Sequence, residues 1–524
     1  MIFFEFLSIM VLLLGIAVIL ILETLNLNKF HAYVTLLALA SSMFVTISFI
    51  VSNSSPEYFG IHISNLDYTN SLLVFDQFTG FFAVLFTGIM FLIIMASISD
   101  LENTEPTNRF VYYVLMLLVT TGMILVSSAV DLAALVVSWE LVSIPSYMLV
   151  AFVKRDKSTS EAAIKYFIIG SMSSALMLFG ASFLYGMSGS TNIYLIMKAV
   201  VSLSDNVTYT PIIIVGIALV VAGFGFKMGI VPFHWWLPDA YEGSMTSVTT
   251  MLAAASKKVG FAAGFRVIMV PLLAFGLIWN GSNPNAQEAT YVILILLAIT
   301  TMIVGNVAAL SQTRMKRLLA YSSIGQAGYI MLALASAALV NYNSTGLVAG
   351  LFHSASHAIM TTAAFICVIA VSRVIKSDEI EDYKGLRNFL PKTSFALGIA
   401  LLGLAGIPPF IGFISKFFIF FAAIDAGNNI TNLGSTLSNL FYIGAFVGIL
   451  TSAISVYYYV RVVKYMWIDS VEEEPKVESK VPWNISVPIF ASVFIMIAAI
   501  ILVNPLVEYL YWVAGQTIGP ILKI

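Results

Sequence analysis

Cysteine and charged residues are both scarce in this sequence of 524 residues. Its one cysteine, Cys367, lies in an apolar run, which excludes a disulfide within the chain, a metal centre built from cysteines and a CxxC redox motif. Only 10% of the residues are charged and the net charge is −2, so no excess of basic residues indicates nucleic-acid binding. The chemistry of the protein therefore has to come from a small number of ionisable side chains.

Apolar residues make up 60% of the sequence, and the mean hydropathy is +0.96. A soluble domain of this size could not hide so much apolar surface, so the composition is typical of an integral membrane protein. About fourteen apolar runs have the ~20 residues that a membrane-spanning helix needs, which predicts an all-α polytopic membrane protein. The expected spans are 2–22, 31–51, 75–98, 109–127, 130–153, 161–187, 211–230 with a continuation to about 252, 254–278, 290–310, 320–341, 346–373, 393–424, 438–466 and 484–513.

Basic residues are distributed unevenly between the expected spans. If the loops are assigned alternately to the two sides with the N-terminus outside, the outer side receives only Lys198 and Lys523 among the Lys and Arg of the loops. The positive-inside rule expects this bias, so both termini are predicted to face the outer side. Of the 25 Lys and Arg, 17 fall in the inner loops, and the remaining 6 lie inside the spans, where a charge is costly and is usually functional. They are Lys165, Lys227, Lys257, Lys258, Arg266 and Lys416.

Two of the expected spans are interrupted by proline. Pro232 follows Lys227 in the run GFGFKMGIVPFHWWLPDAYEG, and Pro408-Pro409 precedes Lys416 in GIPPFIGFISKF. A broken helix frees backbone carbonyls, which are tolerated at membrane depth only where protein or water satisfies them, and such breaks mark ion or substrate sites in transporters. We therefore expect both lysines to take part in proton transfer. The alternative for each is a lysine that neutralises a helix C-terminus or extends to the membrane interface.

Glu140, in the sequence SWELVSIP, is expected deep in the membrane. It lies ~13 Å along a helix from Asp131, and Pro145 weakens the hydrogen bonding of the same helix close to the carboxylate. A lysine partner would keep this carboxylate charged, so we expect Glu140 to form half of a proton-transfer pair. The alternatives are a structural ion pair and a neutral, hydrogen-bonded glutamate.

Lys257 and Lys258 are adjacent, so they point ~100° apart on a helix and only one is expected to face the interior. Lys257 shares a face with small residues that allow close helix packing, which favours it as the buried lysine; Lys258 is expected to face a loop or a neighbouring chain. His353 and His357 share one helix face without a third metal ligand nearby, which suits either proton transfer or a hydrogen-bonded packing pair. Lys165, about one turn inside its span, is either an interfacial anchor or part of the proton pathway.

Three further ionisable residues are expected to be structural or solvated. Asp76 and Asp131 lie near the ends of spans, where a solvated carboxylate at the interface is expected. Arg266 is expected to be structural because a guanidinium stays charged and cannot carry a proton by releasing it.

Several of these segments together resemble a known family. Glu140 in its SWEL context, Lys227 before GIVPFHWWLPDAYEGS, the SKKVG segment and GIPPFIGFISKF are similar to the antiporter-like membrane subunits of respiratory complex I. These subunits are related to those of multisubunit cation/proton antiporters. The resemblance covers nearly the whole chain and implies fourteen helices in two inverted five-helix repeats, with the seventh and twelfth helices broken.

Among these subunits, the sequence is most like chain N, also called subunit 2, of proton-pumping NADH–quinone oxidoreductase. Lys165, Lys416 and the segment DYKGL at 382–386 favour this type, whereas His353 and His357 are similar to histidines of the other two members. The resemblance implies a three-helix segment at 1–108, a first antiporter-like repeat at 109–285, a second, inverted repeat at 286–468, and a polar loop with the last helix at 469–524.

The resemblance also implies a role in proton transfer for each buried charge. Glu140 and Lys227 would be the paired charges of the first half-channel, Lys257 with His353 or His357 the central relay, and Lys416 the last donor toward the outer side, with Lys165 as a further member of the pathway.

Neither a flavin- or nucleotide-binding loop nor cluster ligands occur in the sequence, so the driving energy is expected to come from partner subunits. The chain would be a non-redox subunit of a translocating dehydrogenase, with flavin, iron–sulfur clusters and a quinone-type acceptor in its partners. Expected partners are other antiporter-like and small membrane subunits and lipid, in an energy-transducing membrane such as a prokaryotic inner membrane. A subunit of a cation/proton antiporter, and a scaffold whose charges only hold helices together, are the alternatives.

Overall fold

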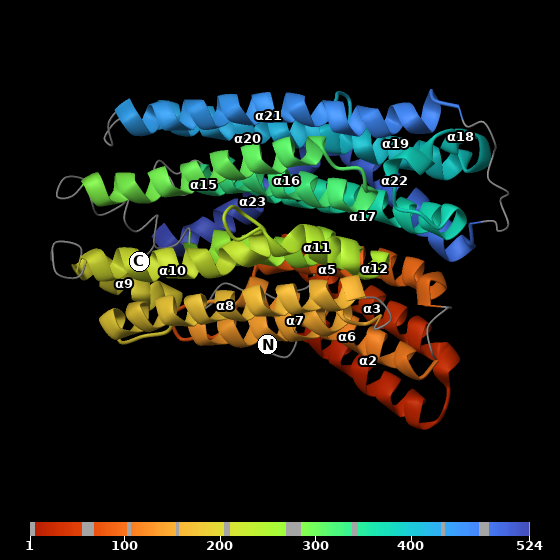
Figure 1. The fold of residues 1–524 in the computed structure, drawn as a ribbon. Coiled ribbons are helices and arrows are strands. Elements are labelled where there is room, and N and C mark those ends of the chain that lie inside the picture. The colour runs from red at the N-terminus through yellow and green to blue at the C-terminus, as the bar shows by residue number, and fades with distance from the viewer. Residues whose placement is uncertain are drawn as a thin grey trace.

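The computed structural model is a bundle of helices that run roughly side by side along one direction (Figure 1). It describes residues 6–54, 68–101, 106–153, 157–203, 210–268, 284–337, 344–430, 435–470 and 481–522. Thirteen helices in this part of the chain are long and apolar enough to cross a membrane, and Pro391–Ala405 is a shorter apolar helix. The prediction of an all-α polytopic membrane protein is therefore confirmed.

The first half of the bundle begins with three helices that precede the candidate site. Helices α6, α7, α8 and α10 follow, with the short helices α9 and α11, and then a helical segment from Thr246 to Ile268 whose hydrogen bonding is partly α and partly π. The bounds are α2 (Leu7–Thr24), η1 (Asn28–Phe30), α3 (His31–Ser54), α5 (Gln77–Asp100), α6 (Pro106–Ser128), α7 (Leu132–Val150), α8 (Lys157–Ser188), α9 (Ile193–Leu203), α10 (Thr210–Met228), α11 (Trp236–Gly243), α12 (Thr246–Thr250), η3 (Met251–Ser256), α13 (Lys257–Ala263) and η4 (Gly264–Ile268).

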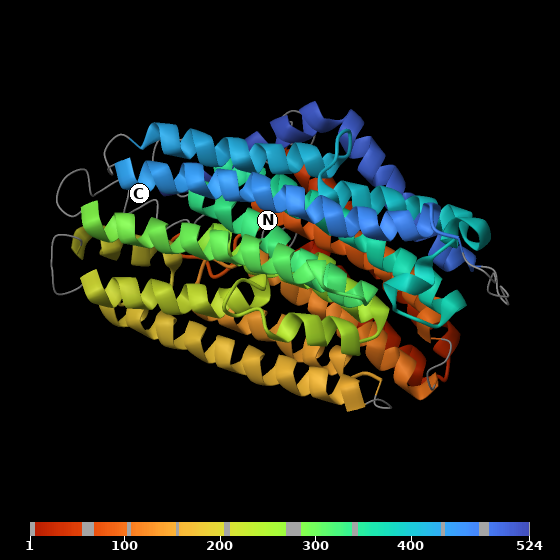
Figure 2. The same ribbon diagram turned by 45° about the horizontal axis from the view of Figure 1, so that its top comes forward.

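The second half lies beside the first in both views, green to blue against red to yellow (Figures 1 and 2). Its last helices, α22 and α23, return to pack against α17, and α22 also packs against α5 of the first half. The bounds are α15 (Pro284–Leu310), α16 (Met315–Ala337), α17 (Thr345–Ile375), η5 (Ile380–Tyr383), α18 (Leu386–Phe389), α19 (Pro391–Ala405), α20 (Ile411–Asn429), α21 (Ser435–Trp467), α22 (Trp483–Ile501) and α23 (Val503–Leu522).

Burial separates central helices from peripheral ones. In α16, 94% of the apolar window is buried, against 28% in α2 and 33% in α21. Residues 246–267, which include both lysines of the SKKVG segment, are buried almost throughout. The centre of the bundle is therefore formed by α16 and by the segment from Thr246 to Ile268, where the two halves of the chain meet.

Two predicted boundaries are wrong. The seventh span ends at Gly243 rather than near 252, and the next helix begins at Thr246 rather than 254. The hydroxyl of Thr249 donates to the Tyr241 carbonyl at 2.9 Å and lies 2.9 Å from the Ser244 hydroxyl, which satisfies the polar groups of a turn at Ser244. The last span is two helices that separate at Leu502, because Pro505 cannot donate to residue 501 and its ring clashes with that carbonyl. The short helix α9 was not predicted at all.

The expectation that Asp76 and Asp131 are solvated is also wrong. Asp76 begins α5, accepts a hydrogen bond from the Thr79 amide at 2.9 Å and forms a 2.6 Å ion pair with Arg266, and both partners are buried. Asp131 caps α7 and accepts a hydrogen bond from Thr191. A helix N-terminus offers unpaired amides and a positive dipole, so it holds a buried carboxylate without water. Arg266 is the counter-ion of Asp76, which agrees with the structural role expected for it.

Replacing Asp76 by alanine should lower the stability of the protein by about 3–5 kcal/mol, because it leaves Arg266 buried without its counter-ion. Thermal denaturation in mild detergent would measure the loss. Asp469→Ala is the matched control, since Asp469 pairs with Lys464 at 3.7 Å near the surface and such pairs contribute at most about 1 kcal/mol. Equal losses in the two variants would contradict the prediction.

Candidate functional site

Both broken helices turn at a glycine in the left-handed region. Helix α10 ends at Met228 and is followed by Gly229 with φ +66°, and α19 ends at Ala405 and is followed by Gly406 with φ +79°. Each glycine touches a lysine: a Cβ on Gly229 would lie 3.2 Å from Lys257 Nζ, and one on Gly406 would lie 3.1 Å from Lys416 Nζ. A side chain at either position would be strained and would push on the lysine, so the breaks and the amines belong to the same local structure.

Lys227 lies in the last turn of α10 and is 1% exposed. Its Nζ donates to the Tyr166 hydroxyl at 3.0 Å, and that hydroxyl lies 3.0 Å from the Ser146 hydroxyl. The Tyr166 ring stacks on Trp236 of α11, with ring centroids 4.5 Å apart. Helices α7, α8, α10 and α11 therefore jointly enclose this amine with aromatic rings and hydroxyl groups.

Glu140 and Lys227 are near each other but do not form an ion pair in the described part of the chain. Glu140 is half-buried on α7, and its Oε1 atom is buried without a hydrogen-bond partner among the described residues. The two charges are close enough to act on each other electrostatically. The pair predicted from the sequence is thus present as neighbours, with Tyr166 rather than Glu140 as the direct partner of the amine.

The expectation that only one of Lys257 and Lys258 is buried is wrong. Lys257 is 2% exposed and Lys258 1% exposed. The helix that carries them is surrounded by protein on all sides, so two side chains that point ~100° apart can both face the interior. Short π-helical segments, η3 and η4, flank α13, and π-bulges are frequent at functional sites.

The two lysines have different partners. Lys257 Nζ donates to the backbone carbonyl of Ser323 at 2.6 Å and to its hydroxyl at 3.0 Å, on α16. Lys258 Nζ lies 2.5 Å from His357 Nδ1, on α17. Lys257 thus faces the broken helix of the first half and α16, whereas Lys258 faces the histidine pair.

His353 and His357 lie on one buried face of α17, with ring centroids 6.2 Å apart. His353 Nδ1 is 2.9 Å from the Ser415 hydroxyl, and its Nε2 is 2.9 Å from Gln326 Oε1. Ser415 immediately precedes Lys416, so the histidine pair bridges the lysine pair and the second broken helix.

Lys416 is 3% exposed and closes the second break. Its Nζ donates to the Leu404 and Ala405 carbonyls and to the Ser452 hydroxyl, each at 3.0 Å. The two carbonyls belong to the last turn of α19, where the dipole favours a positive charge. In this structure Lys416 therefore neutralises a helix C-terminus, which is the alternative role that the sequence left open for it. A cavity of about 410 Å³ between α20 and α21 also reaches Lys416.

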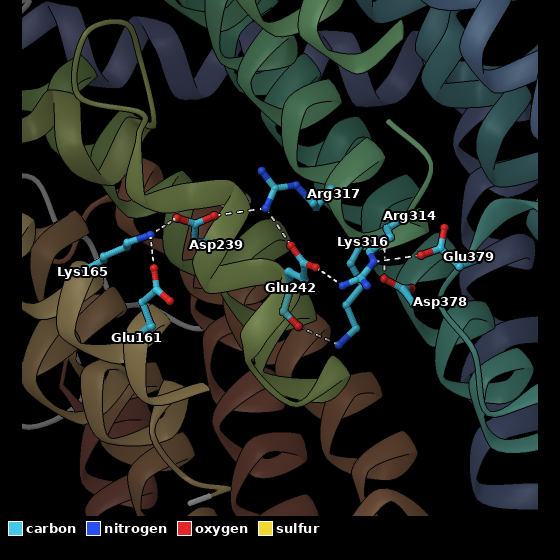
Figure 3. Close-up of polar contacts among 9 residues, drawn as sticks. All are labelled: Glu161, Lys165, Asp239, Glu242, Arg314, Lys316, Arg317, Asp378 and Glu379. Carbon is cyan, nitrogen blue, oxygen red and sulfur yellow. Dashed lines mark hydrogen bonds and ion pairs between the residues drawn. The ribbon is translucent and has the colours of Figure 1, made fainter. Parts of the chain in front are cut away.

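Lys165 lies apart from these buried amines. Its side chain is 43% exposed and forms ion pairs with Glu161 at 2.6 Å and Asp239 at 2.8 Å. Asp239 in turn accepts from Arg317 at 3.1 Å, so α8, α11 and α16 are joined by charges at one end of the bundle (Figure 3). The structure therefore does not bring Lys165 into direct contact with the other predicted residues.

The same end of the bundle carries a wider ion-pair network. Glu242 of α11 accepts from Arg317 at 2.7 Å and also pairs with Arg314, which reaches Glu379 at 2.9 Å beyond α17 (Figure 3). Lys316 donates through Nζ to the Ser244 carbonyl at 3.0 Å. The half-helix α11, beyond the first break, is thus tied to both halves of the protein.

Asp378 lies in this network, in the turn after α17 and outside the membrane-spanning helices. Burial raises the pKa of Asp378 from its ordinary value of 3.8 to about 6, although the charge of Lys316 opposes the change. Its Oδ2 accepts from the Lys316 amide at 3.3 Å, whereas Oδ1 is buried without a partner among the described residues.

Six residues that contact a predicted one were not themselves predicted from the sequence. Five of them are uncharged, and no periodicity distinguishes such residues from others in an apolar helix: Tyr166, Ser323, Gln326, Ser415 and Ser452. Lys258 was visible as a charge within a span, but it was assigned to a loop or a neighbouring chain. Among the described residues, no group of three His, Cys, Asp or Glu side chains could hold a metal ion.

The fold and these buried groups define a class: a polytopic membrane protein with amines and imidazoles in line between two broken helices. The family model described as NADH:quinone oxidoreductase/Mrp antiporter, TM matches residues 129–441, and the chain belongs to this family. The resemblance inferred from the sequence motifs is confirmed.

Curated relatives cover most of the chain. F(420)H(2) dehydrogenase subunit N of Methanosarcina mazei is 39% identical over 441 residues, 82% of this chain and 81% of the relative. NADH-quinone oxidoreductase subunit N of Heliobacterium modesticaldum is 36% identical over 438 residues, 84% of each chain. The similarity is thus to subunit N proteins of dehydrogenases with different named donors.

Solved structures share the fold over nearly the full length. A chain of respiratory complex I from Thermus thermophilus, with bound aureothin, is 27% identical with a TM-score of 0.73, and the alignment covers 96% of this chain and 98% of that chain. A chain of the Mrp complex from Dietzia sp. DQ12-45-1b has a TM-score of 0.82 at 20% identity, covering 99% and 98%, and this likeness concerns the fold alone.

The turn glycines give a prediction with an internal control. Gly229→Ala and Gly406→Ala should each cost more than the about 1–2 kcal/mol of a left-handed backbone, because the new methyl group also displaces Leu237 and crowds Lys257 at the first site, and displaces Lys416 at the second. Gly189→Ala has the same backbone problem, with φ +69°, but nothing lies within 4 Å of its Cβ. Thermal denaturation of the three variants would show the extra loss, and equal losses would contradict it.

The stability of the protein should depend on pH through Asp378. An acid whose pKa is raised in the folded state contributes stability that is fully present below its unfolded-state pKa of 3.8 and is lost as the pH rises through about 6. Asp378→Asn, which keeps an acceptor for Lys316, should therefore be more stable than the parent at pH 7 by up to about 3 kcal/mol and equally stable below about pH 4. Melting temperatures measured from pH 4 to 8 would test this; a difference independent of pH would refute it.

Proposed function

We propose that this chain is a proton-translocating membrane subunit of a complex I-like respiratory oxidoreductase. The observation that carries the proposal is the line of buried ionisable groups between the two breaks. Lys227, Lys257, Lys416, His353 and His357 are each at most 3% exposed, and a hydrogen bond joins His357 to Lys258, which is equally buried. Charges in an apolar membrane interior are costly, and they are retained mainly where ions or protons move.

The first half-channel would work by changing the separation of Glu140 and Lys227. A nearby carboxylate favours the protonated amine, and moving the two apart lowers the proton affinity of that amine. Glu140 has a buried oxygen without a partner, and the amine is bonded to Tyr166 instead, so the present arrangement resembles the separated state. Because the groups titrate together, the transfer belongs to the pair and not to either residue.

The required energy is moderate. Moving one proton against ~100 mV costs ~2.3 kcal/mol, and one pKa unit corresponds to ~1.36 kcal/mol. A change of roughly two pKa units in a coupled group would therefore drive one transfer. We assign the source of this energy to electron transfer in partner subunits, which would carry the flavin, the iron–sulfur clusters and the quinone-type acceptor, so that this chain is a non-redox subunit of the dehydrogenase.

Lys416 would be the last donor toward the outer side. Lys416 is one of the residues that line the cavity between α20 and α21, which supports access to it from that side. Lys165 would act at the other end, where it connects Asp239 of α11 to α8.

We also propose limits for the domains and an orientation of the chain in the membrane. The three-helix segment would be 1–108, the two repeats 109–285 and 286–468, and the last part 469–524. Both termini would face the outer side of a prokaryotic inner membrane, with the network around Arg317 on the inner side, as the positive-inside rule favours. Neighbours would be other antiporter-like subunits and small membrane subunits.

A subunit of a cation/proton antiporter without a redox partner is the second candidate. The family description, which names both the oxidoreductase and the Mrp antiporter, supports this candidate. The relatives at 36–39% identity are named as dehydrogenase subunits, which supports the first proposal. Flavin and iron–sulfur proteins that stay attached in mild detergent would support the oxidoreductase, and their absence from an intact complex would support the antiporter.

Lys227→Met and Glu140→Gln should leave the complex assembled but reduce proton translocation by roughly 10²-fold, the lower end of what a positioned acid–base group supplies. The measurement is quenching of a ΔpH-sensitive dye in membrane vesicles, with NADH or F420H2, the donors named in its relatives, as electron source.

Lys198→Met is the control, because Lys198 is an exposed lysine on α9. It should translocate protons like the parent. If Lys227→Met and Glu140→Gln also translocate normally, the proposed function fails; if they abolish assembly, the charges hold the helices together and the scaffold alternative is favoured.

A further inference from the structure

We propose that Lys258, and not its neighbour Lys257, passes the proton to the second half of the protein, and that His357 Nδ1 is the acceptor. This inference rests on the proposed function and names the residue that connects the two half-channels. The carrying observation is the 2.5 Å contact between Lys258 Nζ and His357 Nδ1, with both residues 1% exposed.

The hydrogen bonds of Gln326 show which nitrogen of His353 faces an acceptor. Gln326 Nε2 donates to the Leu404 carbonyl at 3.1 Å, so its Oε1 is the atom that faces His353. An amide oxygen only accepts, so His353 Nε2 carries a hydrogen. Its Nδ1 lies 2.9 Å from the Ser415 hydroxyl, which also donates to the Gly412 carbonyl at 3.1 Å, so this nitrogen faces the side of Lys416.

His357 has the same arrangement on the opposite side. An ammonium has donors and no acceptor, so Lys258 in its charged form donates to His357 Nδ1. His357 Nε2 then carries the hydrogen and lies 3.2 Å from the Thr361 hydroxyl. His357 Nδ1 thus accepts from Lys258, and His353 Nδ1 faces the hydroxyl next to Lys416.

Lys257 is not placed for this step. Its amine is held by the carbonyl and hydroxyl of Ser323 and touches Gly229, two residues after Lys227. This position suits the receipt of a proton from the first half-channel. Two ammonium groups on adjacent buried residues repel each other strongly at low dielectric, so a proton arriving on Lys257 favours the departure of one from Lys258.

The proton moves from Lys258 to His357 in one step. One N–H bond of the Lys258 ammonium breaks, an N–H bond forms at His357 Nδ1, and the products are a neutral amine and an imidazolium. In the next step an N–H bond of this imidazolium breaks and an N–H bond forms at His353 Nδ1, so the positive charge moves to His353, whose ring centroid is 6.2 Å away. The amine of Lys258 regains a proton from Lys257, which restores the starting state with one proton moved from the first half to the second.

Lys258→Arg separates proton transfer from charge. An arginine keeps a positive charge and hydrogen-bond donors in this position but does not release its proton. Proton translocation in membrane vesicles should therefore fall by roughly 10²-fold in Lys258→Arg, as in Lys258→Gln and His357→Gln, with the complex assembled. The double variant Lys258→Gln/His357→Gln should be no worse than either single variant, because both act in one step.

Normal translocation by Lys258→Arg would overturn the inference, since it would mean that only the charge is needed. Normal translocation by Lys258→Gln, together with loss in Lys257→Gln, would overturn it in favour of Lys257. If Lys258→Arg does not assemble, His357→Gln still decides, because it leaves the lysine in place and removes only the ring that can take up a proton. Failure of the proposed function is a different result, in which Lys227→Met and Glu140→Gln also translocate normally.

Discussion

The cost of a charge in an apolar interior governs this structure. Each buried amine is held by groups that can stabilise a positive charge without water: Tyr166 for Lys227, Ser323 for Lys257, His357 for Lys258, and the carbonyls of α19 with Ser452 for Lys416. For Lys416 the broken helix itself supplies these groups, since the end of α19 releases the Leu404 and Ala405 carbonyls, which a continuous helix would use internally. The partners of the other three amines are side chains and a carbonyl of neighbouring helices.

The position of the first break makes α11 a link between the two halves of the chain. Helix α11 is anchored at its far end by Asp239 and Glu242, which pair with residues of α8 and α16. Single surface ion pairs contribute little, but a network across three helices fixes their relative positions. A movement of α11 would thus disturb Trp236 against Tyr166, and through it the partner of Lys227. Such a connection suits a protein in which a local separation of charges in one half is coupled to the other half of the chain.

Much of the fold could be read from the sequence, and the failures have physical causes. The 20-residue apolar runs predicted the spans because a bilayer imposes their length, but they could not separate α22 from α23 or place the turn at Ser244, where side-chain hydrogen bonds decide. Asp76 and Asp131 were misjudged because proximity to a span end says nothing about a helix cap or a distant arginine.

The sequence by itself determined the class of protein, the two breaks and which ionisable residues lie within the membrane, because hydropathy, proline and charge act locally along the chain. The tertiary structure decided which of those residues meet. Both Lys257 and Lys258 are buried because the helix that carries them has neighbours on every side, and their different partners come from α16 and α17, far away in the sequence. No local pattern contains that information, since the contacts depend on how the two halves pack together.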